Sequence, residues 1–292
     1  MEERLVDCGE VKLSCRLWPG EGTPYLLLHG LASNARWWDL VAAGLSPPSP
    51  LVAPDLRGHG RSDRPAHGYG FAQVGEDLIR LTATTGLECP IVVGHSWGAS
   101  VALWLGAHLP GVRGVVCVDG GVVDLKGVFG DDWSVARERM RPPVMEQLDE
   151  ARVRQFIASS GLAEEAGTEA VAFAMLGNFE LSNEGWLHPR LDMERHLEIA
   201  RALYELRLEE LWPRVGCPVL YLLADDSSSL AQRKRIQGAH ALEMAGRGGE
   251  VRLMKGHHDL PLQHPAAVAA AIASFASKLS SDGATPPSPA TP

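Results

Sequence analysis

Short apolar segments bounded by turn residues recur along this chain. Five of them do not alternate between apolar and polar positions, which is typical of strands buried on both faces of a parallel sheet. Helix-period segments such as Val74–Thr85 and Ser100–His108 lie between them. This alternation predicts an α/β protein with a mostly parallel β-sheet flanked by helices. The five predicted strands are Tyr25–Leu28, Leu51–Ala53, Ile91–Val93, Gly114–Val118 and Val219–Leu223.

The two ends of the chain have different patterns. The stretch from Val6 to Gly20 alternates and contains turn residues, which predicts a hairpin of two further strands. Near the C-terminus, Val251–Met254 predicts a last strand and Ala266–Leu279 a final helix. Residues 280–292 are rich in Pro, Ser and Ala, so we predict a disordered tail there.

The strand pattern is interrupted after the sixth strand. Residues 122–212 contain helical segments and no convincing strand, so we predict an all-helical cap inserted over the strand ends. The predicted organisation is a core in two parts, 1–121 and 213–279, with the cap at 122–212 and the tail at 280–292. The helical segments of the cap are Val135–Met140, Val144–Ser159, Glu164–Leu176 and Leu191–Leu211.

Composition narrows the possible partners. The net charge of −9 argues against nucleic acid or an anionic membrane surface as a partner. The chain has no run of 18 apolar residues and no apolar segment typical of a signal peptide near its start. Its five cysteines are scattered without metal-binding spacing, which predicts free thiols and no zinc site. Together these features predict a cytoplasmic protein that acts on a small molecule.

A serine follows the strand Ile91–Val93 directly. The sequence Gly94-His95-Ser96-Trp97-Gly98 matches Gly-x-Ser-x-Gly, which places a serine on a sharp turn between a strand and a helix. A serine hydroxyl becomes a good nucleophile only when a neighbouring base takes its proton. Because the motif follows a predicted strand and opens a predicted helix, we interpret Ser96 as a nucleophile.

The serine motif is one of four segments that form a recognisable set. They are Leu26–Trp38, Ala53–Asp63, Ile91–Gly98 and Lys255–Pro265. Together these segments resemble the α/β-hydrolase superfamily, in its capped, esterase-like branch. They occur in the family's order, and the resemblance covers roughly residues 4–278. It implies an α/β-hydrolase fold with a catalytic triad in the chain order Ser, acid, His.

The resemblance also suggests the partners of Ser96. His258 is the preferred base and His257 the alternative, because the family's histidine lies shortly before the final helix. The acid usually follows the strand that here ends at Leu223, so Asp226 is preferred and Asp225 is an alternative. The glycine that normally opens that turn is missing. Asp119, after the preceding strand, is therefore a second alternative.

Other site roles follow from the same resemblance. The backbone N–H groups of Leu31 and Trp97 are expected to form an oxyanion hole. Trp37, Trp38, Trp97 and Trp133 could line an apolar substrate pocket, although core packing is the ordinary role of any one of them. Structural rather than catalytic roles are expected for a further set of polar residues: His29, Asp55, Arg57, His59, Asp63 and His196.

These features predict a serine hydrolase that cleaves a carboxylic ester or similar acyl bond without a cofactor or metal ion. The same triad could instead act on peptides with N-terminal proline, amides, lactones or the carbon–carbon bonds of diketones. From a different class, the chain could be a ligand receptor with little or no turnover. The sequence leaves the oligomeric state open.

Overall fold

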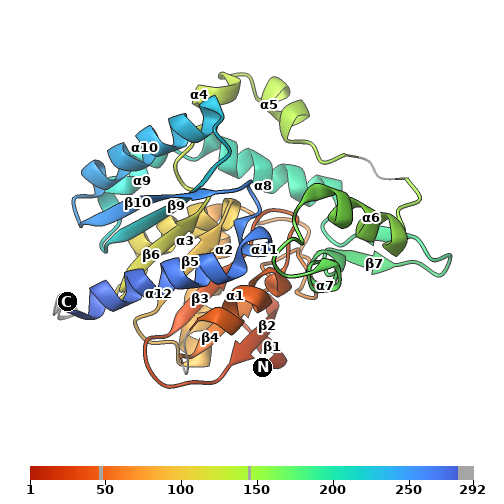
Figure 1. Cartoon of the computed structure of the whole chain (residues 1–292), viewed down its shortest axis with the longest axis horizontal. Helices are drawn as coiled ribbons and strands as arrows, with labels where there is room; N and C mark the ends of the chain where they lie inside the picture. The colour runs from red at the N-terminus through yellow and green to blue at the C-terminus, as the bar shows by residue number, and fades with distance from the viewer. Residues whose placement is uncertain (46–48, 144–145, 282–292) are drawn as a thin grey trace.

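The computed structural model describes residues 1–45, 49–143 and 146–281. Eight strands form one sheet in the order β1-β2-β4-β3-β5-β6-β9-β10 (Figure 1). The hairpin β1–β2 is antiparallel and β2 pairs antiparallel with β4, whereas the other neighbours are parallel. The mostly parallel sheet is therefore confirmed. The strands are β1 Glu2–Asp7, β2 Lys12–Trp18, β3 Tyr25–Leu28, β4 Leu51–Pro54, β5 Ile91–His95, β6 Gly114–Val118, β9 Val219–Asp225 and β10 Gly249–Lys255.

Both faces of the sheet are buried. Successive side chains of a strand point to opposite faces. In β5, Val92 packs into one apolar core, whereas Ile91 and Val93 pack into the other. This two-sided burial explains why the strand sequences do not alternate. The first core includes side chains of α2 (Phe71–Thr85), α3 (Trp97–His108) and α10 (Ser229–Ala245), and the second includes side chains of α1 (Asp39–Gly44) and α12 (Pro265–Ser281).

Short helices connect these elements to the strand ends. The 3₁₀ helix η1 follows β3 and leads into α1, and α11 precedes α12. The predicted final helix is confirmed, but it continues through Ser281, so the first two residues of the predicted tail are helical. The remainder of that tail lies outside the described residues. The short helices are η1 Ala35–Trp38, α9 Leu208–Leu211, η2 Trp212–Arg214 and α11 Leu260–Gln263.

The segment between β6 and β9 is mainly helical, as predicted, but it is not all helical. Two short strands, β7 (Phe179–Leu181) and β8 (Leu187–Pro189), form an antiparallel hairpin. Three-residue strands are too short to show a period, so the sequence pattern missed them. Figure 1 shows α4 and α5 above the sheet and α6 and α7 beside it. The helices are α4 Leu125–Phe129, α5 Trp133–Met140, α6 Glu150–Ser160, α7 Thr168–Leu176 and α8 Met193–Glu205.

The inserted segment has its own apolar core. Val153 and Ile157 of α6 pack with Val171 of α7, and Trp37 and Leu262 of the main body join them. The helix predicted over Val144–Ser159 starts later, at Glu150, and residues 144–145 lie outside the described part of the chain. Among the helices that the structure describes, none has the length and apolar character needed to cross a bilayer. All five cysteines are unpaired, and Cys89 alone is exposed.

Candidate active site

Ser96 lies on a tight turn between β5 and α3. Its backbone is in a region that non-glycine residues rarely adopt, with φ 55° and ψ −118°. The flanking glycines permit the turn: a Cβ on Gly94 would lie 2.0 Å from the Gly98 carbonyl oxygen, and one on Gly98 would lie 2.5 Å from that of Leu28. The motif therefore folds as the sequence predicted, with the serine presented at the carboxyl edge of the sheet.

His258 lies next to Ser96, although the two are 162 positions apart in the sequence. Its Nε2 is 2.9 Å from Ser96 Oγ. Its Nδ1 is 2.6 Å from Asp119 Oδ2. Since an ionised carboxylate can only accept, Nδ1 carries the proton and Nε2 is left to accept one from the serine. This is the arrangement that a serine nucleophile and a general base require.

Asp119 is held by two neighbouring strands. It follows β6, its N–H donates to the Leu222 carbonyl oxygen at 2.8 Å, and its Oδ1 accepts from the Ala224 N–H at 2.9 Å. Its backbone has a φ of 46°, and its side chain is fully buried. The adjacent ends of β6 and β9 thus aim this carboxylate at His258.

The preference for Asp226 over Asp119 is corrected by this geometry. Asp225 and Asp226 accept hydrogen bonds from the Ser227 and Ser228 N–H groups, at 3.0 Å each, within their own turn. Because β9 runs on to Asp225 without a glycine turn, neither carboxylate folds back toward the histidine. The alternative base His257 is exposed, and its ring makes no hydrogen bond among the described residues.

Opposing influences act on the Asp119 carboxyl. Burial alone would raise its pKa. Hydrogen bonds and charges from His258 and Lys234 outweigh burial and lower the pKa to about 2. Asp119 is therefore ionised at neutral pH and able to stabilise a protonated imidazole.

His95, inside the serine motif, supports the His258 loop. Its Nε2–H donates to the His258 carbonyl oxygen at 2.9 Å, and the two rings are 4.9 Å apart. Trp37 stacks on the other side of His95 at 5.7 Å. Burial, together with the charge of His258, lowers the pKa of His95 to about 4, so the ring is neutral near pH 7. This role could not be predicted from the motif, because any residue fits that position.

Trp97, one of the two expected oxyanion donors, directly follows Ser96 and lines the same cavity. Trp97 is the first residue of α3, so its N–H has no acceptor within the helix. Gly30 packs on the opposite side, where an added Cβ would lie 3.2 Å from Ser96 Cβ. The backbone of Gly30, which precedes Leu31, therefore approaches the serine closely.

A cavity of about 380 Å³ opens at Ser96; we refer to it as the Ser96 cavity. Of the four tryptophans considered for the pocket, Trp97 lines it, but Trp37, Trp38 and Trp133 do not. Trp38 is fully buried in the core, Trp37 stacks on His95, and Trp133 packs on Tyr204 at 5.3 Å. That prediction was wrong because tryptophan is as suited to core packing as to a binding site. Apolar walls are provided instead by residues that include Val123, Leu125, Val128, Phe129, Leu203 and Leu230.

The polar residues of the loop after β4 make hydrogen bonds within the fold. Asp55 accepts from the Ala35 and Arg61 N–H groups at 2.7 and 2.8 Å. His29 Nε2 accepts from the Leu56 N–H at 2.9 Å, which fixes the loop next to the site. Arg57 pairs with Asp77 through two bonds of 2.6 and 2.7 Å. On the inserted segment, the His196 ring bonds the Met140 carbonyl oxygen.

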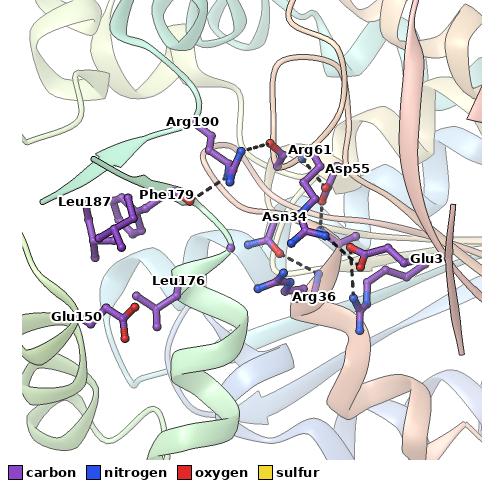
Figure 2. Close-up of a pocket in the computed structure, with 15 residues that line it drawn as sticks. Glu3, Asn34, Arg36, Asp55, Arg61, Glu150, Leu176, Phe179, Leu187 and Arg190 are labelled. Carbon is purple, nitrogen blue, oxygen red and sulfur yellow. Dashed lines mark hydrogen bonds and ion pairs between the residues drawn. The ribbon is translucent and has the colours of Figure 1, made fainter. Parts of the chain in front are cut away.

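A second cavity, of about 230 Å³, lies between the main body and the inserted segment (Figure 2). We refer to it as the arginine cavity, after Arg16, Arg36, Arg61 and Arg190 in its wall. Arg61 pairs with Glu3 at 3.3 Å, and Arg190 donates to the carbonyl oxygens of Phe179 and Gly60. Ser96, Asp119 and His258 are not among its lining residues. Its charged groups connect two parts of the fold rather than converge on a reacting group.

Comparison with known proteins shows the family of this chain. The family model described as "Alpha/beta hydrolase family" matches residues 25–271. The chain belongs to the α/β hydrolase family. Among solved structures, E-2-(acetamidomethylene)succinate hydrolase superposes with a TM-score of 0.74 at 24% identity, over 94% of this chain and 99% of that one. The thioesterase domain from the curacin biosynthetic pathway superposes at 0.71 with 19% identity, over 93% and 99%. At sequence identities of 24% and 19%, these structural similarities show the fold alone.

Sequence relatives differ in the reactions that their names describe. The 2-(acetamidomethylene)succinate hydrolase of Mesorhizobium japonicum is 37% identical over 40% of this chain and 42% of its own. A fluoroacetate dehalogenase of a Burkholderia species is 38% identical over 33% of each chain. The first curated relatives, uncharacterised mycobacterial proteins, are matched over only 33% of their length. Family membership therefore indicates hydrolase chemistry but leaves the bond open.

Proposed function

We propose that this protein is a serine hydrolase that cleaves a carboxylic ester or a chemically similar acyl bond. The observation that carries the proposal is the position of the His258 ring, 2.9 Å from Ser96 Oγ on one side and 2.6 Å from Asp119 Oδ2 on the other. In this proposal Asp119, not Asp226, is the acid of the triad.

The reaction follows from the geometry. Ser96 Oγ attacks the acyl carbon while His258 Nε2 takes the hydroxyl proton, and Asp119 stabilises the imidazolium that forms. The N–H groups of Leu31 and Trp97 hold the negative oxygen of the tetrahedral intermediate. His258 then passes the proton to the leaving group, which leaves an acyl ester on Ser96. Water, deprotonated by His258, hydrolyses that ester and restores the serine.

The identity of residue 96 argues against the dehalogenase reaction of one relative. Displacement of a halide by a carboxylate gives an ester, which water can hydrolyse in a second step. Displacement by a serine hydroxyl would give an ether, which water does not cleave under these conditions. Ser96 therefore favours acyl transfer, where the covalent intermediate is itself an ester.

A fluorophosphonate probe tests the proposal directly. We expect one equivalent to attach to Ser96, as located by mass spectrometry of the digested protein, and to block hydrolysis of a p-nitrophenyl acetate substrate. Heat-unfolded protein is the control, because it keeps the serine but loses its contact with His258. Absence of label on Ser96 in the folded protein would instead support the alternative of a ligand receptor without turnover.

A further inference from the structure

The triad carboxylate has a second cationic partner. Lys234 of α10 places Nζ 2.7 Å from Asp119 Oδ2, the same oxygen that accepts from His258 Nδ1 at 2.6 Å. The lysine side chain is largely buried, with 14% of its surface exposed. The contact is therefore part of the site's interior and not a surface ion pair.

Two cations that share one carboxylate leave an excess of positive charge during the reaction. When His258 accepts the Ser96 proton it becomes positive, and Asp119 must then balance both the imidazolium and the ammonium. Asp226 also lines the Ser96 cavity, but it is exposed to solvent and bonded within its own turn. Its charge is therefore screened by water. An anion bound beside Lys234 would restore the balance.

Lys234 has N–H donors that could bind such an anion. An ammonium group has three N–H donors. Only the bond to Asp119 is found for it among the described residues, and the side chain lines the Ser96 cavity. Donors that face a partly desolvated cavity bind a carboxylate more strongly than donors in open water.

The other residues of the cavity restrict the rest of the ligand that carries this anion. Val128, Phe129 and Leu203 give the wall an apolar character beside the lysine. Between Lys234 and Ser96 stand one carboxylate and one imidazole ring. A ligand that reaches both groups therefore needs its carboxylate only a few bonds from its acyl carbon.

We propose that Lys234 is a substrate-binding residue, and that the substrate is the half-ester of a short dicarboxylic acid, or the corresponding amide or thioester, with its free carboxylate on Lys234 Nζ. This proposal rests on the proposed function, since it assigns the substrate class of the same triad.

A matched pair of esters tests it. Monomethyl glutarate and dimethyl glutarate have the same chain and differ in one negative charge. We expect the native protein to hydrolyse the monoanion with a kcat/KM about 10- to 100-fold higher, the size of a charge-assisted contact. Lys234→Met should remove this preference, and Lys234→Arg should keep most of it. Arg235→Met removes an exposed positive charge one residue away and should leave the ratio unchanged.

A binding measurement covers the case in which Lys234→Met impairs the triad itself. In a Ser96→Ala background, calorimetry should detect binding of monomethyl glutarate, and the added Lys234→Met change should weaken it at least about 10-fold. Equal loss of activity on both esters with unchanged binding would assign Lys234 to support of Asp119 alone and overturn the proposal. The proposal also fails if the native protein prefers the neutral ester.

These outcomes are distinct from failure of the proposed function. If Ser96 takes the fluorophosphonate label and p-nitrophenyl acetate is cleaved, but the monoanion is not preferred, only the assignment of the substrate class is wrong. If Ser96 is not labelled and no ester is cleaved, both proposals fall together.

Discussion

The arginine cavity and the Ser96 cavity both contain charged residues, but these residues are paired in different ways. In the arginine cavity, Arg61 is paired with Glu3, and Arg190 is bonded to carbonyl oxygens (Figure 2). In the Ser96 cavity, His258 keeps Nε2 on a reactive hydroxyl, and half of its side chain is exposed. The comparison teaches that charged residues in a cavity indicate chemistry only where a donor or acceptor remains available to a ligand.

His59 stands between the two cavities. It precedes Gly60, which lines the arginine cavity, and stacks at 5.4 Å on Trp97, which lines the Ser96 cavity. His29 packs edge-on against it at 4.9 Å. Both rings are buried, and neither is among the residues that line the two cavities.

The largest expected effect is at Ser96. Ser96→Ala should lower kcat for p-nitrophenyl acetate by about 10⁶-fold, because the acyl-enzyme can no longer form. Thermal unfolding should be nearly unchanged, since alanine fills the same turn. Initial rates at saturating substrate, together with calorimetry, provide the measurement. Retention of most of the activity would show that the hydroxyl in this cavity is not the nucleophile.

The acid of the triad gives the next largest effect. Asp119→Asn should lower kcat by about 10⁴-fold, because an amide neither stabilises the imidazolium nor selects the correct tautomer. Asp226→Asn is the matched control, one strand away and exposed, and should change kcat by less than about twofold. Steady-state kinetics of both variants decide the assignment. The reverse order of effects would restore Asp226 as the acid.

Acid should destabilise the fold around the buried histidines. Burial lowers the pKa of His59 and His95 to about 4, and that of His29 well below its usual value. Between about pH 6.5 and 4 the unfolded chain therefore binds more protons than the folded one. The stability that these neutral rings provide is complete above about pH 6.5 and falls as the pH drops toward 4. For three such groups, the free energy of unfolding should fall by up to about 4 kcal/mol for each pH unit.

Urea unfolding at a series of pH values measures this slope. His59→Gln removes one buried histidine and should reduce the slope by up to about 1.4 kcal/mol per pH unit. His67→Gln alters an exposed histidine and should leave it unchanged. A slope that is identical in all three proteins would mean that the buried rings are protonated in the folded state as readily as in the unfolded one.

The smallest expected effect belongs to the arginine cavity. Arg190→Met leaves two carbonyl oxygens without their guanidinium donor, which should cost about 1 to 3 kcal/mol of unfolding free energy. Turnover should stay within about twofold of the native value. Arg139→Met, on an exposed face of α5, is the control and should be neutral in both measurements. A large loss of turnover with Arg190→Met would mean that the two cavities are coupled.

Much of the fold could be predicted from local pattern. The buried strands were found because β5 and its neighbours are apolar on both faces, and the position of Ser96 followed from Gly94 and Gly98 around it. The hairpin β7–β8 was missed, since three residues per strand carry no period. The pocket tryptophans were misassigned because a bulky apolar residue gives the same pattern in a core as in a binding site.

The sequence alone determined the parallel sheet, the turn that presents Ser96, and the presence of a histidine after the last strand. These depend on residues close together in the chain, where backbone sterics and apolar periodicity act locally. Only the tertiary structure decided that Asp119, and not Asp226, faces His258, and that Lys234 shares that carboxylate. Both contacts join residues more than 100 positions apart, and their geometry depends on how β6, β9 and α10 pack against one another.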